Sequence, residues 1–365
     1  MTFDRNRPYN DLPPLPPPGV ELETKAVLKK AIAANKALAD LRGAGQLIPN
    51  QSVLIQALGL QEAKLSSEIE NIVTTNDELY RAFADNDGGG HSPQAKEVLR
   101  YKDALWLGHT AIKQGNRPIN TRLYEELFQT IKQTTEGVRR LPGTKLKNPT
   151  NNEIIYTPPE GETLLRDKLA NLDAFINNHD DGLDPLIKMA VMHYQFEAIH
   201  PFSDGNGRTG RILNVLYLIE RGLLDIPVLY LSRYIIEHKD GYYLGLRGIT
   251  ERQEWEAWLL YMLSAVEETA VLTRQRIMAI HDLMEQTAAT VREKLPKLRG
   301  VSDLMAVIFR QPYCKIAFLE QHGIGNRQTA ATYLDKLESI GVFVSTKVGR
   351  EKYYINPAYF ELLAN

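Results

Sequence analysis

One stretch of the sequence brings several reactive side chains together within twelve residues. It runs from His200 to Arg211 as HPFSDGNGRTGR and holds an imidazole, a carboxylate, three glycines and two guanidinium groups. Apolar residues then recur at helical spacing until Gly222, so the glycines are expected at a helix N-terminus. Unpaired amides and the helix dipole favour an anion there. The stretch therefore predicts a phosphate-binding loop with a base beside it.

Two familiar nucleotide-binding loops do not explain this stretch. GNGRTG matches the dinucleotide fingerprint GxGxxG, but that loop follows a strand in a βαβ unit. Here the preceding segment has helical periodicity, and no βαβ alternation occurs in the sequence. A Walker loop is excluded because no Gly-Lys-Ser/Thr is present, and neither HExxH nor paired CxxC supports a zinc site. A nucleoside triphosphate bound in another way is the remaining interpretation.

The individual side chains suit such a ligand. Arg208 and Arg211 lie three residues apart on one helix face and can hold β- and γ-phosphates. Asp204 can bind Mg²⁺, and His200 can accept a proton from a hydroxyl nucleophile near pH 7. Taken singly, each has a structural alternative as a helix cap or a solvated charge. His193 lies on the apolar face of its helix and is expected to be structural.

The rest of the chain must position these groups, and its patterns are mainly helical. Residues 1–19 are proline-rich and predict an extended arm, either lying on the domain surface or docking a partner. Residues 85–90 predict a loop. Asp184 followed by Pro185 predicts a helix start. Helices are expected over residues 20–42, 51–58, 60–71, 92–115, 121–134, 162–177, 185–199, 206–221, 232–250 and 254–295, the last with a possible break.

Residues 138–159 differ from this helical pattern. Turn residues over 146–152 are followed by the β-branched and aromatic segment 153–157, which predicts a β-hairpin. A hairpin without a role is one interpretation. The other is a flap, including Ile155, Tyr156 and Thr157, whose edge pairs with an extended segment of a protein substrate.

The last 70 residues predict a separate unit. Helices are expected over 302–310, 314–321 and 326–340, and strands over 342–345 and 352–355, in the order of a winged helix-turn-helix. From Pro296 onward there are nine Lys or Arg against six Asp or Glu, which is mildly basic. DNA binding and a protein–protein or dimer role both stay open. The expected recognition helix carries Arg327, Gln328, Thr329, Thr332 and Lys336.

The central stretch resembles a family signature. HPFSDGNGRTGR matches His-Pro-Phe-x-Asp/Glu-Gly-Asn-Gly-Arg-x-x-Arg of Fic (filamentation-induced-by-cAMP) proteins at every fixed position, and the resemblance covers roughly residues 100 to 285. It implies transfer of AMP from ATP to a Ser, Thr or Tyr hydroxyl of a protein. By this resemblance His200 is the general base and Asp204 the Mg²⁺ ligand. The residues implied in ATP and phosphate binding are Gly205, Asn206, Gly207, Arg208, Thr209, Gly210 and Arg211.

The resemblance extends to two further segments. Tyr242 and Tyr243 resemble the family's double tyrosine near the adenine, with core packing as the alternative. Upstream, Ser66 to Asn71 fits the inhibitory pattern Ser/Thr-x-x-x-Glu-Gly/Asn. In this interpretation Glu70 forms an ion pair with Arg211 and occupies the cation that the γ-phosphate needs. Ser66 and Asn71 are the other fixed positions of the pattern.

These inferences give a mainly α protein with four parts. They are a proline-rich arm (1–19), a helical region with the inhibitory helix (20–99), a Fic-type helical core with one β-hairpin flap (100–295) and a C-terminal winged helix-turn-helix (296–365). The net charge of −2 argues against bulk coating of nucleic acid or membrane. One cysteine, and no apolar run of signal-peptide or membrane-spanning type, predict a cytoplasmic protein.

The leading functional hypothesis is an autoinhibited protein adenylyltransferase that uses ATP and Mg²⁺. Its acceptor is a protein hydroxyl, on another protein or on the chain itself, and a homodimer is one expected assembly. Two alternatives use the same site differently: removal of AMP from a modified protein, and nucleotide sensing by a DNA-binding regulator. Transfer of another nucleotide or of phosphate also stays open.

Overall fold

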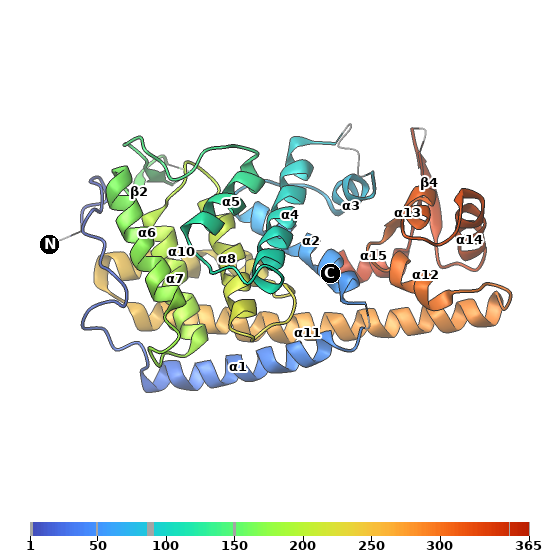
Figure 1. Ribbon diagram of the computed structural model, residues 1–365, viewed down its shortest axis with the longest axis horizontal. Coiled ribbons are helices and arrows are strands. Elements are labelled where there is room, and N and C mark those ends of the chain that lie inside the picture. Colours follow the sequence, from blue (N-terminus) through green and yellow to red (C-terminus); the bar gives the residue numbers. More distant parts are fainter. Residues whose placement is uncertain (1–2, 49, 86–90, 149–150, 350, 365) are drawn as a thin grey trace.

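The structure is a computed structural model that describes residues 3–48, 50–85, 91–148, 151–349 and 351–364. Most of the loop expected at 85–90, and two residues of the turn expected at 146–152, lie outside these ranges. The described chain is mainly helical with two small antiparallel sheets (Figure 1). Its first part comprises α1 (Lys25–Gly45), α2 (Gln51–Ile69), α3 (Asn76–Asp85), α4 (Pro93–Lys113), α5 (Thr121–Lys132), β1 (Leu146–Lys147), β2 (Ile154–Tyr156), α6 (Glu162–Asn177), α7 (Pro185–Ile199), α8 (Asn206–Glu220), α9 (Leu231–Glu237), α10 (Lys239–Arg252) and α11 (Trp255–Lys294).

The second part is the C-terminal unit. Its three expected helices precede its two expected strands, and β5 lies between β3 and β4 in one antiparallel sheet. Two elements were not expected from sequence, the short strand β3 and the last helix α15. The elements are α12 (Val301–Ile308), β3 (Tyr313–Cys314), α13 (Ile316–Gln321), α14 (Arg327–Ser339), β4 (Val344–Val348), β5 (Glu351–Ile355) and α15 (Pro357–Ala364).

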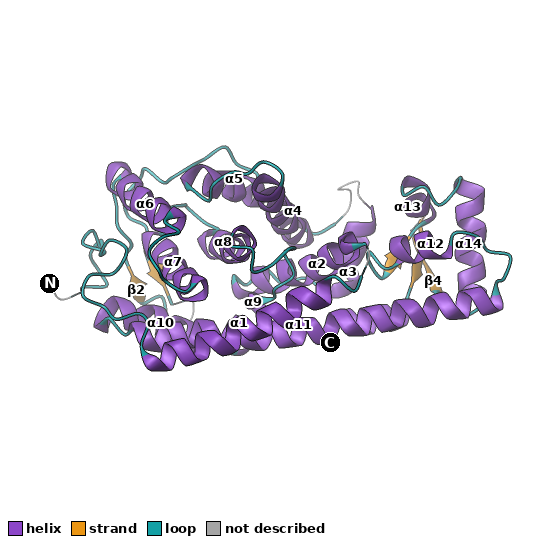
Figure 2. Cartoon of the chain, turned by 60° about the horizontal axis from the view of Figure 1, so that its bottom comes forward, coloured by secondary structure: helices purple, strands orange, loops and turns teal. Residues whose placement is uncertain are grey.

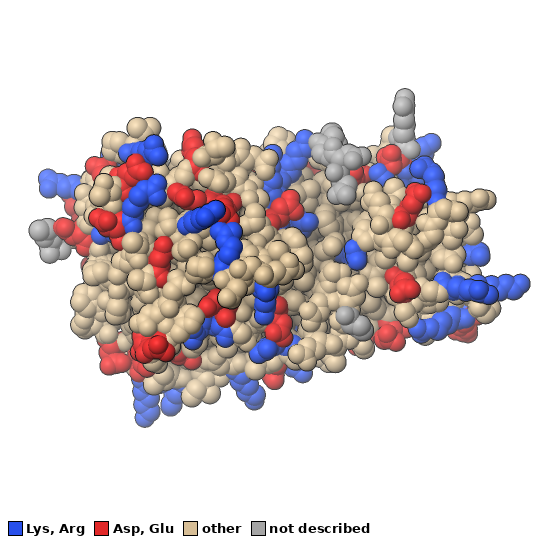
Figure 3. Space-filling view, in the orientation of Figure 1, with Lys and Arg blue, Asp and Glu red and all other residues tan. Residues whose placement is uncertain are grey.

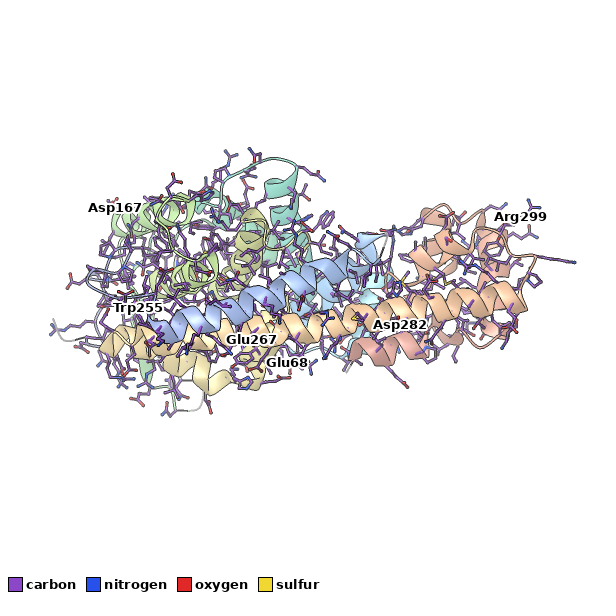
Figure 4. The ribbon with its side chains drawn as sticks, turned by 90° about the horizontal axis from the view of Figure 1, so that it is seen from below. Glu68, Asp167, Trp255, Glu267, Asp282 and Arg299 are labelled. Carbon is purple, nitrogen blue, oxygen red and sulfur yellow. The ribbon has the colours of Figure 1, made fainter. Side chains whose placement is uncertain are left out.

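Helix α11 connects the two parts. It is 40 residues long, which corresponds to about 60 Å at the helical rise. Figure 4 shows it running from Trp255 past Asp282 toward the C-terminal unit near Arg299, with α1 along its first half. An ion pair of 2.7 Å joins Lys30 Nζ to Glu267 Oε2 across these two helices. The helix has no break, because no proline or glycine interrupts residues 255–294.

Helix α8 lies at the centre of the first part and carries the predicted site residues from Asn206 to Arg211. It packs against α2, α4, α5 and α7, which enclose it (Figure 2). Side chains from Arg208 to Ile219 are buried, including both arginines. Burying a guanidinium is costly unless it is paired and hydrogen-bonded, so the neighbouring helices must supply acceptors.

Several predicted boundaries were wrong, for local reasons. The two helices expected over 51–58 and 60–71 are one helix, α2, because a single interior glycine, Gly59, costs only about 1 kcal/mol. Conversely, the helix expected over 232–250 is divided into α9 and α10 at His238, whose backbone leaves helical geometry (φ −125°, ψ 40°). Cys314 lies in β3 rather than in a helix. None of the described helices has the length and apolar character needed to cross a bilayer.

Candidate active site

The backbone at His200 is held in an unusual conformation where α7 ends. His200 has φ 49° and ψ 60°, in the left-handed region, and its N–H donates to Phe196 O (3.0 Å). Arg139 Nε donates to His200 O (2.8 Å), and the Arg139 N–H donates to Pro201 O (2.8 Å). Tyr156 of the flap donates its hydroxyl to Ala198 O (2.8 Å). The backbone around His200 is therefore braced by the hairpin and by Arg139, which sequence reasoning did not identify.

The His200 imidazole lies in an environment that disfavours its protonated form. Burial, together with the nearby Arg139 cation, lowers the pKa of His200 from its ordinary value to about 4. The ring is therefore neutral at pH 7 and can accept a proton. His193 is also buried, but its Nε2 contacts the Tyr242 hydroxyl (2.9 Å) and its ring stacks on Trp258, as expected for a structural residue.

The glycine-rich stretch forms the N-terminus of α8, as predicted. Gly205 is the N-cap residue with φ 72°, a conformation that a Cβ disfavours. The Asn206 side chain closes the loop: its Oδ1 accepts from Phe202 N–H and its Nδ2 donates to Phe202 O, both at 2.9 Å. Thr209 Oγ1 donates to Gly205 O (3.0 Å). Asn206 and Thr209 therefore shape the loop with their side chains, while the amides of the first turn have no intrahelical acceptor and can face an anion.

The two arginines turn to different partners. Arg208 Nη1 lies 2.5 Å from Glu97 Oε1 of α4, and Arg208 Nη2 lies 3.9 Å from Asp204 Oδ2. Glu97 also pairs with Lys132 Nζ of α5 (2.9 Å). Hydrogen bonds from Arg208 and Lys132 lower the pKa of Glu97, although burial opposes this shift. Arg208 is thus fixed by a network that involves neither α2 nor Arg211.

Arg211 is held by the C-terminal turn of α2. Its Nε donates to Ser66 Oγ (2.8 Å), and its Nη2 donates to Ser66 O (2.9 Å) and to Glu70 Oε1 (3.0 Å). Burial disfavours the charged guanidinium, but Glu70 and neighbouring groups raise the pKa of Arg211. The predicted pair between Glu70 and Arg211 is therefore present, although 141 residues separate them in sequence.

The Glu70 carboxylate lies over the start of α8. A Cβ placed on Gly207 would come within 2.3 Å of Glu70 Oε1, so only glycine permits this approach. Asn71 has φ 62° directly after the C-cap residue Glu70. Glycine or asparagine is favoured at such a left-handed helix end, which gives a physical reason for the last position of the Ser66–Asn71 pattern.

Asp204 is the predicted metal ligand. Its side chain is 63% exposed, and its Oδ2 lies 2.7 Å from Lys132 Nζ. Burial of the Asp204 carboxyl opposes ionisation, but hydrogen bonding to Lys132 lowers its pKa below the ordinary value. No cluster of three or more His, Cys, Asp or Glu suited to a metal occurs among the described residues. One ionised carboxylate beside a phosphate site fits Mg²⁺, which takes its remaining ligands from water and phosphate oxygens.

A cavity of about 740 Å³ joins the histidine, Arg211 and the flap. Of the predicted residues, those in its wall are Glu70, Asn71, Ile155, Tyr156, His200, Gly207, Arg211, Tyr242 and Tyr243. Those outside it are Ser66, Thr157, Asp204, Gly205, Asn206, Arg208, Thr209 and Gly210. Tyr242 is buried with its hydroxyl on His193, whereas Tyr243 is 44% exposed. Tyr242 therefore packs in the core as well as lining the cavity.

Two carboxyl groups near Arg211 were not identified from sequence, that of the buried Glu62 and that of the partly buried Glu197. Glu62 accepts a hydrogen bond from Ser232 N–H (3.3 Å). On α2 it lies one helical turn before Ser66 and two turns before Glu70. Glu197 lines the cavity, and within the described part of the chain its buried Oε1 has no hydrogen-bond partner. Burial raises the pKa of each to about 7. The spacing of Glu62, Ser66 and Glu70 is the signal that could have revealed the first of them.

The predicted hairpin is short. Leu146 pairs with Tyr156 and Lys147 with Ile154 in antiparallel register, and Asn148 N–H donates to Glu153 O (2.8 Å). Tyr156 is buried, whereas Ile155 is only partly covered and lines the cavity. The hairpin thus stands beside His200, where a flap is expected.

Family models match three consecutive parts of the chain. They are described as "Fic/DOC family N-terminal" over residues 28–110, "Fic/DOC family" over residues 118–218 and "Protein adenylyltransferase SoFic-like, C-terminal domain" over residues 283–359. The second match contains the whole stretch from His200 to Arg211, and the first contains Ser66 to Asn71.

Curated relatives are similar over part of their length. A probable protein adenylyltransferase of Aquifex aeolicus is 47% identical over 179 residues, which are 48% of this chain and 52% of that protein. The protein adenylyltransferase fic-1 of Caenorhabditis briggsae is 37% identical over 68 residues, 18% of this chain and 13% of that protein. The chain thus covers about half, or less, of these relatives.

Solved structures share the fold. A Fic family protein from Desulfovibrio desulfuricans has a TM-score of 0.55 at 18% identity, covering 92% of this chain and 97% of the other. A Fic domain containing signaling protein from Bacteroides thetaiotaomicron has a TM-score of 0.53 at 17% identity, covering 70% and 97%. The solved structures therefore share the fold, and the family models show that residues 28–110 and 118–218 of this chain are domains of the Fic/DOC family.

Proposed function

We propose that this chain is a protein adenylyltransferase, which transfers AMP from ATP to a hydroxyl group of a protein, and that Glu70 holds it inhibited. One observation carries the proposal: a neutral His200, the N-terminal turn of α8 and Arg211 meet in one cavity of about 740 Å³. The cavity is large enough for a nucleotide. Relatives described as protein adenylyltransferases support the same reaction.

The geometry supports a simple reaction. The oxygen of a Ser, Thr or Tyr hydroxyl attacks the α-phosphorus of ATP, and the bond between this phosphorus and the α–β bridging oxygen breaks. Pyrophosphate leaves, and His200 accepts the hydroxyl proton. Amides at the start of α8, together with Arg208 and Arg211, stabilise the charge on the phosphates. Asp204 would hold Mg²⁺, which neutralises phosphate charge when bound, and Lys132 would have to release the Asp204 carboxylate to permit this.

Inhibition follows from the contacts of α2. Glu70 and Ser66 together provide three acceptors for Arg211, and the Glu70 carboxylate lies over Gly207, where phosphate oxygens would approach the amides. A γ-phosphate would have to displace the Glu70 carboxylate from the Arg211 guanidinium, and the two negative groups would repel each other. Productive ATP binding therefore requires the end of α2 to move or Glu70 to turn away.

A direct experiment is a search for AMP adducts. The Glu70→Gly variant is incubated with ATP, Mg²⁺ and a cell lysate, and proteins that gain AMP are identified by mass spectrometry. The proposal expects adducts on Ser, Thr or Tyr, and none with the Glu70→Gly/His200→Ala double variant. Equal adducts with both variants, or none with either, would contradict it.

A second candidate, removal of AMP, is favoured by the position of Glu70. Its carboxylate lines the same cavity as His200 and could orient a water molecule toward a bound AMP ester. Incubating an AMP-modified protein with the wild type and with Glu70→Gly separates the two functions. Only an eraser needs the carboxylate, so loss of AMP with wild type alone supports removal.

For the C-terminal unit two roles are proposed, contact with DNA and contact with a second copy in a homodimer. The unit would be a winged helix-turn-helix with α14 as recognition helix, although two α14 carboxylates, Asp335 and Glu338, pair with Lys352 of β5. On the face in Figure 3, Lys and Arg are interspersed with Asp and Glu. Gel-shift titration at several salt concentrations tests the first role, and sedimentation tests the second. A cytoplasmic location is also proposed, which the buried free thiol of Cys314 fits.

A further inference from the structure

The proline-rich N-terminal arm reaches the active site. Residues 3–15 of the segment predicted as an arm (1–19) lie outside all three segments matched by family models, and from here on they are called the arm. The sequence left open whether the arm covers the domain or docks a partner. In the structure it runs beside α6, α7 and the flap, at one end of the molecule (Figure 1).

Main-chain and charged contacts tie the arm to the flap. The Tyr9 N–H donates to Thr157 O (3.0 Å), and Thr157 Oγ1 donates to Arg5 O (2.6 Å). Arg5 Nη1 forms an ion pair with Glu153 Oε1 (2.7 Å). The arm therefore lies against the residues on both sides of β2.

Aromatic rings extend this contact to the cavity. Phe3 stacks on Tyr156 with 6.0 Å between ring centroids, and Tyr9 meets both rings edge-on at 5.4 and 6.4 Å. Tyr156 in turn donates its hydroxyl to Ala198 O, two residues before His200. Phe3 itself lines the cavity.

The rest of the arm is anchored to α6 and α7. Lys168 Nζ donates to Leu12 O (2.8 Å), and Gln195 Nε2 donates to Pro13 O (2.8 Å). The Asn171 amide makes a pair of hydrogen bonds with Leu15, at 2.7 and 3.0 Å. Leu12 and Leu15 are buried. These anchors fix the position from which residues 3–9 reach the flap.

We propose that the arm is a part of the acceptor-binding groove: it holds the flap beside His200, and Phe3 provides an apolar wall for the acceptor segment. A hairpin of two- and three-residue strands is marginal alone and needs outside support. The arm supplies that support, while the apolar residues Phe3, Leu146 and Ile155 line one side of the cavity. This inference rests on the proposed transfer to a protein hydroxyl and names an extended protein segment with an apolar neighbour as the preferred acceptor.

The test uses the full chain with Phe3→Ala/Tyr9→Ala, and Arg7→Ala as matched control. Arg7 is an arm residue whose side chain is 84% exposed and pairs only with Asp4 among the described residues. Hydrogen–deuterium exchange is measured in the flap segment 153–157 and in α8. In the double variant the flap amides should exchange about fivefold faster, as loss of an aromatic cluster implies. The exchange rates of the α8 amides should stay unchanged. The control should match the wild type in both.

The functional part is measured in a Glu70→Gly background with ATP labelled at the α-phosphate. Phe3→Ala/Tyr9→Ala should lower the ratio of protein-bound AMP to free AMP about fivefold, because transfer to water needs no acceptor groove. Flap exchange equal to that of the control overturns the support role, and an unchanged ratio overturns the acceptor role. If Glu70→Gly consumes no ATP, the proposed reaction and the acceptor role fail together, and flap exchange still decides the support role.

Discussion

Replacing Ser66 with alanine should partly release inhibition. Its hydroxyl is the acceptor for Arg211 Nε, at 2.8 Å in a fully buried position. Ser66→Ala leaves this N–H unpaired only while Arg211 is held on α2, so the change destabilises the inhibited arrangement. In the proposed mechanism Arg211 turns toward phosphate, so the active arrangement should lose much less.

The size of the effect follows from the remaining contacts. An unpaired buried donor costs about 1–3 kcal/mol, and more when the group is charged. Arg211 keeps two acceptors, the Ser66 carbonyl at 2.9 Å and Glu70 Oε1 at 3.0 Å, so a value near the lower end applies. A cost of about 1.4 kcal/mol corresponds to roughly a tenfold rise in the fraction of active molecules.

The chain offers a matched control in Ser67. Its side chain is also fully buried on α2, but its Oγ has no hydrogen-bond partner among the residues that the structure describes. The assay is AMP transfer from ATP labelled at the α-phosphate, with ATP affinity measured by calorimetry. Ser66→Ala should raise both about tenfold, and Ser67→Ala should change neither by more than about twofold. Equal behaviour of the two variants would refute the role of Ser66.

Other predictions concern the base, the metal ligand and a buried acid. His200→Ala should lower transfer by about 10²–10⁴-fold with ATP affinity kept, as calorimetry and labelling can show. In the wild type, whose His200 pKa is lowered to about 4, the rate should stay level down to pH 5 and fall as the imidazole is protonated below that. Asp204→Asn should weaken ATP binding in Mg²⁺ by roughly tenfold and change it little in EDTA, as calorimetry can show. Burial raises the pKa of Glu62 from 4.5 to about 7. The protonated carboxyl therefore contributes to the free energy of unfolding fully below pH 4.5, and this contribution is lost as the pH rises through 7. Glu62→Gln does not titrate, so its Tm advantage over wild type should grow between pH 5 and pH 8; a constant difference would contradict the buried-acid assignment.

The sequence predicted the contiguous part of the site well, because its chemistry is local. Gly205 and the residues after it form a helix start whatever packs around them, so the amide cradle could be inferred from the glycines and the periodicity that follows. The contact from Glu70 to Arg211 was predicted although 141 residues separate them, but through the family pattern rather than by physics. Periodicity alone gave α2 as two short helices and could not show which face meets α8.

The partners of the buried charges could not be predicted, because they depend on which helices pack together. Glu97 and Lys132 come from α4 and α5, and nothing in their local sequence distinguishes them from solvated charges. Arg139 lies in an irregular segment and acts on His200 through backbone carbonyls. The arm was predicted to be extended. Its contact with the flap joins residues about 150 positions apart in the sequence, and no local pattern indicates that pairing.

The most direct test of the central claim compares Glu70→Gly with wild type in AMP transfer from ATP labelled at the α-phosphate, at equal protein and Mg²⁺ concentrations. Removing the carboxylate from Arg211 and Gly207 should raise transfer by at least about tenfold, the effect of losing a charge-assisted hydrogen bond. The added His200→Ala change should abolish that gain. Transfer by Glu70→Gly at the wild-type level would contradict a site that Glu70 holds closed.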